Sequence, residues 1–293
     1  MPYHRKGLGE RVSDGVIVLT MWLALAVTLY PFLYIISMSI SDPVNVVNKS
    51  VWLLPKGLSG EAYVRVFANP DLWQSYGNTV FYTVAGTALN VALTIMAAYP
   101  LSIRNFIIRK PMMIFIVLTM FFTGGLVPMF ILVQELGIYN TRWAILLPTA
   151  ISAFNVIIAR TFFQGIPEGL HESAKLDGAN DAVILVRIVL PLCKPILAVL
   201  TLFYAVSHWN SFMPALLYLS DSSLQPLSLY LIKVLIQNDT NMLEGMMEQS
   251  ARSLYAVQIK YAIIVVAVLP IVVIYPFLQK YFVKGVLIGS LKE

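Results

Sequence analysis

The side chains best suited to chemistry lie in one stretch, IPEGLHESAKLDGANDAVILVRIVLPL, at residues 166–192. There His171 stands beside Glu172 and close to Asp177, the one grouping with the composition of a catalytic cluster. A membrane-embedded enzyme would need such a cluster at the membrane interface. Three residues of this kind on a surface helix and turn are more typical of a face that meets water or another protein, so we expect no enzymatic activity.

Other catalytic and metal-binding chemistry is poorly supported by the sequence. Cys193 is the only cysteine, which excludes an internal disulfide and a Cys-x-x-Cys metal site. The three histidines, His4, His171 and His208, do not have the spacing of zinc ligands. No G-x-x-x-x-G-K-[ST] loop is present to cradle a phosphate. We therefore expect no cofactor on this chain, and any ATP chemistry to come from another one.

Composition predicts an integral membrane protein. The 293 residues are 58% hydrophobic and 12% charged, with a mean hydropathy of +0.77, whereas soluble domains carry about 25% charged residues. A helix needs about 20 apolar residues to cross a bilayer. We predict a single all-α domain, residues 1–293, with six transmembrane helices at about 15–40, 78–103, 112–134, 142–162, 196–219 and 260–283.

The basic residues predict the orientation of these spans. Thirteen of the 20 Lys and Arg residues fall in or at the edges of the two tails, the second connection and the central loop 163–195, and seven fall around the outer loops 41–77 and 220–259. Because short basic loops stay in the cytoplasm, we predict that both termini and the central loop are cytoplasmic. The positive charge then orients the protein, and we expect no nucleic-acid partner.

Polar residues inside the spans allow two interpretations. No Asp or Glu lies near the centre of a span, which argues against a carrier driven by a proton or sodium gradient. The most polar run, YAVSHWNSFMPA, lies in the fifth span. Its residues are either hydrogen-bond partners between helices or the lining of a pathway for a polyhydroxylated solute. The pathway candidates are Asn155, Tyr204, His208, Trp209 and Asn210.

Two features outside the central stretch concern shape. Gly124, Gly125 and Pro128 are expected to break the third span, which favours either close helix packing or a gate. The outer loop 41–77 carries Trp52 and Trp73, typical of an interfacial aromatic belt or of a docking surface for an external partner.

The central stretch predicts a helix-turn-helix elbow. Pro167 and Glu168 suit the start of a helix over EGLHESAKL. Asp177-Gly178 should end it, because glycine adopts left-handed conformations without steric cost. Asn180 or Asp181 can then cap a second helix, AVILVRIVL, which Pro191 ends or bends. An elbow of this kind between the fourth and fifth spans can transmit a push to both of them.

At these residues the chain resembles the permease subunits of binding-protein-dependent ABC importers, whose EAA motif reads E-A-A-x-x-D-G-A with a downstream L-P. The matching residues are Glu172, Ala174, Asp177, Gly178, Ala179, Leu190 and Pro191, with Ser173 at the second position, a small residue in place of a small residue. The six-span layout, GGLVPMFIL, HWNSFMPALLYL and the tail YFVKGVLIGSLKE resemble the carbohydrate-uptake, maltose-permease-like branch, and within it permeases for complex or acidic oligosaccharides such as alginate or pectin fragments.

The resemblance implies a role and a set of partners. It implies a multi-pass subunit of the bacterial cytoplasmic (inner) membrane that forms half of a pathway with a second, related permease. It also implies two cytoplasmic ATPase subunits that carry ATP and Mg²⁺, and an extracytoplasmic binding protein that delivers the oligosaccharide. The elbow would dock in a groove of the ATPase, with Glu172 and Gly178 as the chief coupling positions. The alternative is a self-sufficient secondary transporter or channel for a polar solute.

Overall fold

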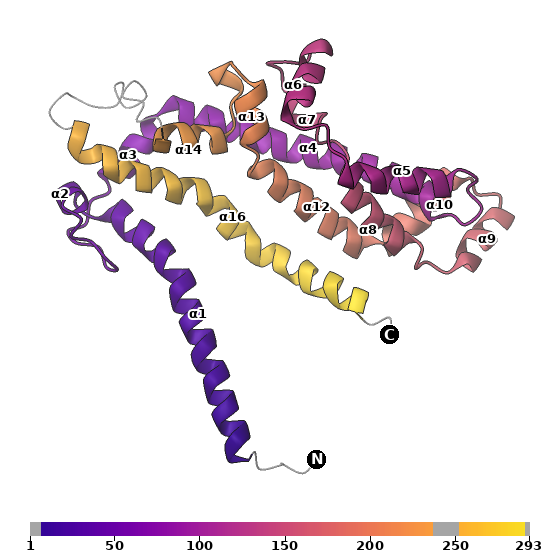
Figure 1. Cartoon of the computed structure of the whole chain (residues 1–293), viewed down its shortest axis with the longest axis horizontal. Coiled ribbons are helices and arrows are strands. Elements are labelled where there is room, and N and C mark those ends of the chain that lie inside the picture. Colours follow the sequence, from indigo (N-terminus) through magenta and orange to yellow (C-terminus); the bar gives the residue numbers. More distant parts are fainter. Residues whose placement is uncertain (1–6, 237–251, 291–293) are drawn as a thin grey trace. The chain divides into compact units, whose positions relative to one another are not determined.

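The structure, a computed structural model, describes residues 7–236 and 252–290. The described chain is helical, with one isolated β-bridge between Ser41 and Leu58 (Figure 1). This confirms the predicted all-α class. The chain forms two compact units, Met1–Pro70 with Lys233–Leu269 and Asp71–Ile232 with Pro270–Glu293.

Among the described residues, the first unit contains three helices and the beginning of a fourth, apart from residues 233–236, which end a helix of the second unit. They are α1 (Leu8–Ile40), α2 (Pro43–Val47), α3 (Glu61–Ala68) and the part of α16 (Arg252–Ser290) that precedes Pro270. Its small core consists of the buried Met38, Val46 and Val51, with Tyr34 and Tyr261 packed against them. The predicted outer loop 41–77 is thus partly helical and folded onto its neighbours, although Trp52 and Trp73 are exposed.

One buried amide fastens this unit together. Gln258 is fully buried, and its Nε2 donates hydrogen bonds to the carbonyl oxygens of Ser39 at 3.1 Å, Ser41 at 2.8 Å and Ser59 at 3.4 Å. Burying an amide is favourable only when it is hydrogen-bonded. Gln258 therefore ties α16 to the end of α1 and to the start of α3. The predicted outer loop 220–259 contributes this residue, while its portion 237–251 lies outside the described residues.

The second unit is built around α4 (Pro70–Ser102). Its further helices are α5 (Arg109–Phe121), α6 (Leu126–Glu135), α7 (Trp143–Leu146), α8 (Ala153–Phe163), α9 (Glu168–Leu176), α10 (Asp181–Ile184), the π-helix Leu185–Val189, α11 (Leu190–Leu192), α12 (Lys194–Trp209), α13 (Met213–Tyr218), the 3₁₀ turn Ser222–Leu224 and most of α14 (Leu227–Ile236). The end of α16 also belongs to it.

The predicted spans are helical but not all continuous. By length and composition three helices can cross a membrane alone: Val12–Ile40, Pro70–Ser102 and Tyr255–Val273. Two further pairs, α5 with α6 and α10–α11 with α12, are bent by 116° and 85°. The prediction for 142–162 was of one helix, but the structure has α7 and the short α8 with a break between them. Pro148, which has no N–H to extend a helix, lies in that break, and α8 starts afresh at the N-cap Ser152, whose side chain accepts from the N–H of Asn155.

The break in the third predicted span lies at its glycines. Gly125 has a φ of +85°, a conformation that favours glycine, and it forms the N-cap of α6. Pro128 falls in the first turn of α6, where a missing N–H costs little. The sequence correctly located the interruption, but the glycine pair produces it, with the proline only starting the next helix.

Candidate functional site

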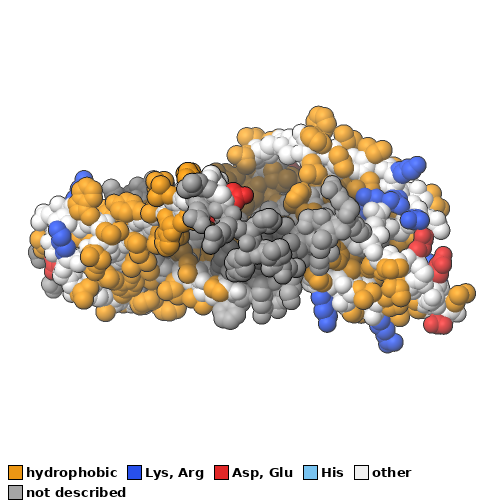
Figure 2. Space-filling model, turned by 90° about the horizontal axis from the view of Figure 1, so that it is seen from below, with side chains coloured by type: hydrophobic (Ala, Val, Ile, Leu, Met, Phe, Trp, Pro, Cys, Tyr) orange, Lys and Arg blue, Asp and Glu red, His pale blue; other side chains and the backbone are white. Residues whose placement is uncertain are grey.

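The elbow, residues 167–193, is set at the end of the second unit. Its first helix spans Glu168–Leu176, the range predicted from the sequence. Figure 1 shows α9 beyond the ends of α8 and α10, and Figure 2 shows acidic side chains gathered on that end of the second unit. Hydrophobic side chains cover much of the rest of the visible surface, as expected of a chain embedded in lipid.

The turn of the elbow explains the D-G-A part of the motif. Gly178 has a φ of +81°, its N–H donates to the carbonyl of Lys175 at 3.0 Å, and the N–H of Ala179 donates to the carbonyl of Ala174 at 2.9 Å. This pair of bonds is a Schellman motif, which satisfies the last carbonyls of a helix and needs a left-handed residue. Gly178 supplies that residue, so the spacing from Ala174 to Ala179 is set by backbone geometry.

The second half of the elbow starts on a capped turn and bends twice. Asn180 Oδ1 accepts a hydrogen bond from the backbone N–H of Val183 at 2.8 Å, as predicted for a cap. The chain then passes through the π-helix, in which Leu190 N–H bonds to Leu185, before turning at Cys193. Pro191 has no N–H to continue an α-helical ladder, and π-turns often mark functional sites. The sequence predicted a plain second helix here.

The motif residues divide into an anchored and an exposed set. Ala174 is only 8% exposed and lies in a core cluster with residues of α4, α8 and α12, while Ala179 and Leu190 are half-buried. The remaining five are exposed: Glu172, Ser173, Asp177, Gly178 and Pro191. Leu176, beside them, is 89% exposed. The elbow is thus fixed from within and presents an apolar residue and carboxylates outward.

Two contacts join the elbow to its surroundings, and a third joins its two halves. The ring of His171 stacks on buried Tyr99 of α4, with centroids 6.2 Å apart. Arg104 Nη1, in the turn between α4 and α5, lies 3.1 Å from Glu168 Oε2. Lys175 Nζ lies 3.2 Å from Asp181 Oδ1 and links the two halves of the elbow. These exposed ion pairs each contribute at most about 1 kcal/mol, so apolar packing provides most of the attachment.

The five predicted pathway residues separate into two groups. Asn155, Tyr204 and His208 are buried between helices, whereas Trp209 is half-buried and Asn210 exposed. Trp209 lies 6.5 Å from the ring of Tyr76, centroid to centroid, and Asn210 Nδ2 donates to the carbonyl of Val206 within its own helix.

The buried group belongs to a polar seam between α4, α8 and α12. The hydroxyls of Tyr204 and Thr94 are 2.6 Å apart, and Tyr204 also accepts from the N–H of Ser152 at 3.3 Å. Asn90 Nδ2 donates to the carbonyl of Thr149 at 3.0 Å. The His208 ring lies against Gly86, so close that a Cβ there would be 2.4 Å from its Nε2. Tyr204 and Asn90 join the helices through these hydrogen bonds, whereas His208 Nε2 has no hydrogen-bond partner among the described residues.

Metal chemistry finds no support in the described chain, where no three His, Cys, Asp or Glu side chains are grouped to hold an ion. The anchored, capped elbow and the polar seam instead fit a protein whose helices move relative to one another. Comparison with known sequences decides the class. The profile of the binding-protein-dependent transport system inner membrane components matches residues 90–288. The chain belongs to this family.

Individual relatives of this permease span nearly all of it. It is 43% identical to the polygalacturonan/rhamnogalacturonan transport system permease protein of Bacillus subtilis (strain 168), over 97% of this chain and 99% of the relative. It is also 43% identical to protein LplC of the same organism, over 96% and 95% of the two chains. The first of these relatives is a transport system permease protein, and this permease is likewise a component of a transport system.

A solved structure has the same fold as this permease. It is the crystal structure of a bacterial ABC transporter involved in the import of the acidic polysaccharide alginate. The match has a TM-score of 0.89 at 33% identity and covers 96% of this chain and 100% of that chain.

Several residues of the permease site escaped the sequence analysis. Thr83, Thr87 and Thr94 recur on one face of α4 with Asn90, which the sequence already marked as a polar residue inside a span, and this periodicity was available to find the seam. No such signal marked Gly86, or Arg104 and Glu168 as a pair, because the residues that contact one another lie far apart in the chain.

Proposed function

We propose that this permease is the membrane-spanning subunit of an ATP-driven importer for oligosaccharides and that it crosses the bacterial cytoplasmic membrane six times, with both termini inside. The bent pairs and the divided segment 142–162 each count as one crossing in this proposal. The distribution of basic residues supports the orientation. The chain would form half of the pathway, and a second, related permease the other half.

The observation that carries the proposal is the construction of the elbow. It is anchored inward through Ala174 and closed by a Schellman turn, while Glu172, Ser173, Asp177 and Leu176 face outward. A rigid element with an exposed polar and apolar face can be displaced by a second protein and can transmit that displacement to α4, α8 and α12. Such a transition needs two arrangements of a packed bundle that its partners bias.

The partner that pushes would be an ATPase. The chain has no phosphate-binding loop, so two separate ATPase subunits would bind ATP and Mg²⁺. They would contact the elbow through its coupling residues, which are Glu172, Ser173, Ala174, Asp177, Gly178, Ala179, Leu190 and Pro191. Of these, the buried Ala174 would act by positioning the helix. An extracytoplasmic solute-binding protein would deliver the substrate, as the name of the family indicates.

The proposed substrate is an oligosaccharide rich in uronates. The names of two matches support it, one a polygalacturonan/rhamnogalacturonan permease and the other an alginate importer. Trp209 and Asn210, which are not buried, are the pathway candidates placed to meet a sugar without rearrangement; Asn155, Tyr204 and His208 would first have to be uncovered as the seam opens.

Transport by the complete complex in proteoliposomes tests this function. Uptake of oligogalacturonides should require ATP on the side of the ATPases and should persist after ionophores collapse the proton and sodium gradients. Uptake that follows an ion gradient and proceeds without ATPase subunits would instead establish a self-sufficient carrier.

A further inference from the structure

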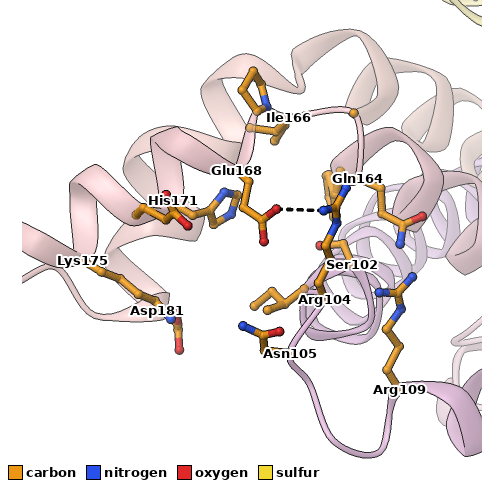
Figure 3. A pocket seen from close by; sticks show the side chains of 15 residues that line it. Ser102, Arg104, Asn105, Arg109, Gln164, Ile166, Glu168, His171, Lys175 and Asp181 are labelled. Atoms are coloured by element: carbon orange, nitrogen blue, oxygen red, sulfur yellow. Dashed lines mark ion pairs between the residues drawn. The ribbon is translucent and has the colours of Figure 1, made fainter.

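A pocket of about 610 Å³ lies beside the elbow, wholly within the second unit. Its walls come from the turn between α4 and α5, the segment joining α8 to α9, and the elbow itself (Figure 3). Figure 3 shows Arg104, Asn105, Arg109 and Gln164 on one side and His171, Lys175 and Asp181 on the other. The coupling role proposed above accounts for one residue of its wall, Glu172, and leaves the basic side of the pocket unexplained.

The two sides of the pocket differ in how their charges are balanced. On the elbow side Asp181 is paired with Lys175 and Glu168 with Arg104, while Glu172 also lines the pocket and forms no ion pair among the described residues. On the other side, the amide oxygen of Gln164 is oriented toward two arginines. It accepts from Arg109 Nη2 at 2.8 Å and from Arg160 Nη2 at 3.0 Å. Two guanidinium groups thus converge on one neutral oxygen, and among the described residues neither forms an ion pair. This arrangement leaves positive charge uncompensated at the basic side.

The chemistry of two converging guanidinium groups favours a tetrahedral oxyanion. Planar guanidinium forks match phosphate oxygens in geometry and form charge-assisted hydrogen bonds about twice as strong as neutral ones. Arg109 is half-buried in the pocket wall and Asn105 adds a further amide donor. A phosphate there would neutralise the positive charges of the guanidinium groups, whereas the neutral amide of Gln164 only accepts hydrogen bonds from them.

The surface around the basic side indicates where that phosphate comes from. Ile107 is 94% exposed and Ile108 is exposed beside it, directly before Arg109. The helix that follows, α5, has no buried residue and exposes Phe115 and Ile114. Exposed aliphatic side chains next to basic residues at the end of an apolar helix are typical of the membrane interface, where basic pockets hold lipid headgroups.

We propose that the basic side of this pocket binds the phosphate of an anionic phospholipid, with Arg109 in the pocket wall as its ligand and the acyl chains lying along α5; Arg160, outside the lining but bonded to the same Gln164, adds a second positive charge nearby. The inference requires only that the chain is embedded in a bilayer, so it stands or falls separately from the import function. A bound lipid would hold the α4–α5 turn against the elbow and make coupling sensitive to the lipid composition.

Native mass spectrometry of the purified complex tests the site, with phosphatidylglycerol and phosphatidylcholine as probes. We expect the wild-type complex to retain phosphatidylglycerol in preference to phosphatidylcholine. Arg109→Gln should weaken this retention about fivefold, the effect of one basic residue near an anionic surface. Lys110→Gln, which removes the same charge from the adjacent residue outside the pocket, should leave it unchanged.

A second variant guards against misfolding. Gln164→Glu places a carboxylate between the two guanidinium groups, so it should preserve thermal stability and still abolish the preference for phosphatidylglycerol. Retention in Gln164→Glu equal to that of the wild type would overturn the proposal, as would an equal loss in Lys110→Gln. Inorganic phosphate is the remaining probe: if it stabilises the lipid-free wild type but not Gln164→Glu, and no phosphatidylglycerol is retained, the site is one for free phosphate and the lipid is wrong.

Discussion

At the scale of the residue, Gly178 is the position where backbone geometry most restricts the side chain. With a φ of +81°, any other residue pays about 1–2 kcal/mol for the left-handed conformation. A Cβ there would meet no atom within 4 Å, so the cost is conformational and not steric. We predict that Gly178→Ala loosens the Schellman turn and lowers ATP-driven uptake, and that Gly178→Asn is milder because Asn tolerates this region.

The control for that prediction is Gly169→Ala. Gly169 lies in α9, the helix that the turn at Gly178 ends, and it also has no neighbours for a Cβ but ordinary helical geometry. Uptake and thermal unfolding of the complex should be unaffected by it or slightly improved, since Ala favours helix. Equal losses in the two variants would contradict a role for the left-handed turn.

Gly86 is the second critical glycine, for a steric reason. A Cβ at this position would lie 2.4–2.8 Å from three atoms of the His208 ring. We predict that Gly86→Ala destabilises the protein by about 1–3 kcal/mol through overpacking, measured as a lower unfolding temperature in detergent. Gly77→Ala on the same helix, where space is open, is the matched control. Adding His208→Ala should recover much of the loss, and no recovery would show that the clash is not the cause.

At the scale of the element, the polar seam should couple α4 to α12. The hydroxyls of Thr94 and Tyr204 are buried and 2.6 Å apart. A double-mutant cycle with Thr94→Val and Tyr204→Phe should give a coupling energy of about 0.6 kcal/mol, the average for hydrogen bonds between membrane helices. Additive effects on the unfolding free energy would mean that this contact does not join the helices.

The attachment of α9 gives a further prediction. Ala174 faces the core cluster, while Ser173 next to it faces outward. Ala174→Leu should overpack the cluster at a cost of about 1–3 kcal/mol and uncouple ATP hydrolysis from uptake by tilting the elbow. Ser173→Leu adds a similar volume on the exposed face and should leave thermal stability unchanged. Equal destabilisation by the two would contradict the assignment of faces.

Sequence predicted the elements best where local signals decide them. The range of α9, the cap at Asn180 and the turn at Gly178 follow from side chains and conformations within a few residues. The division of 142–162 was missed because hydropathy averages over a break such as the one at Pro148. The hydrogen bonds that Gln258 donates and the basic side of the pocket depend on partners distant in the chain, which no local pattern encodes.

At the scale of the whole molecule, we propose that the elbow is the moving link between a membrane pathway and an ATPase. The family match and the elbow's anchored, exposed construction support this claim, and the bent helix pairs give the bundle points at which it can rearrange. Coupling of this kind requires that the ATPase favours one arrangement of the bundle over the other.

The most direct test uses disulfide crosslinking at Leu176. The only native cysteine, buried Cys193, is replaced by Ala, and Leu176→Cys is paired with single cysteines scanned over the ATPase surface in membranes. Phe115→Cys, on exposed α5, is the negative control. The account predicts a crosslink at Leu176 whose yield changes between the ATP-free state and the state trapped with ATP and vanadate. Active transport without a Leu176 crosslink at any ATPase position would contradict it.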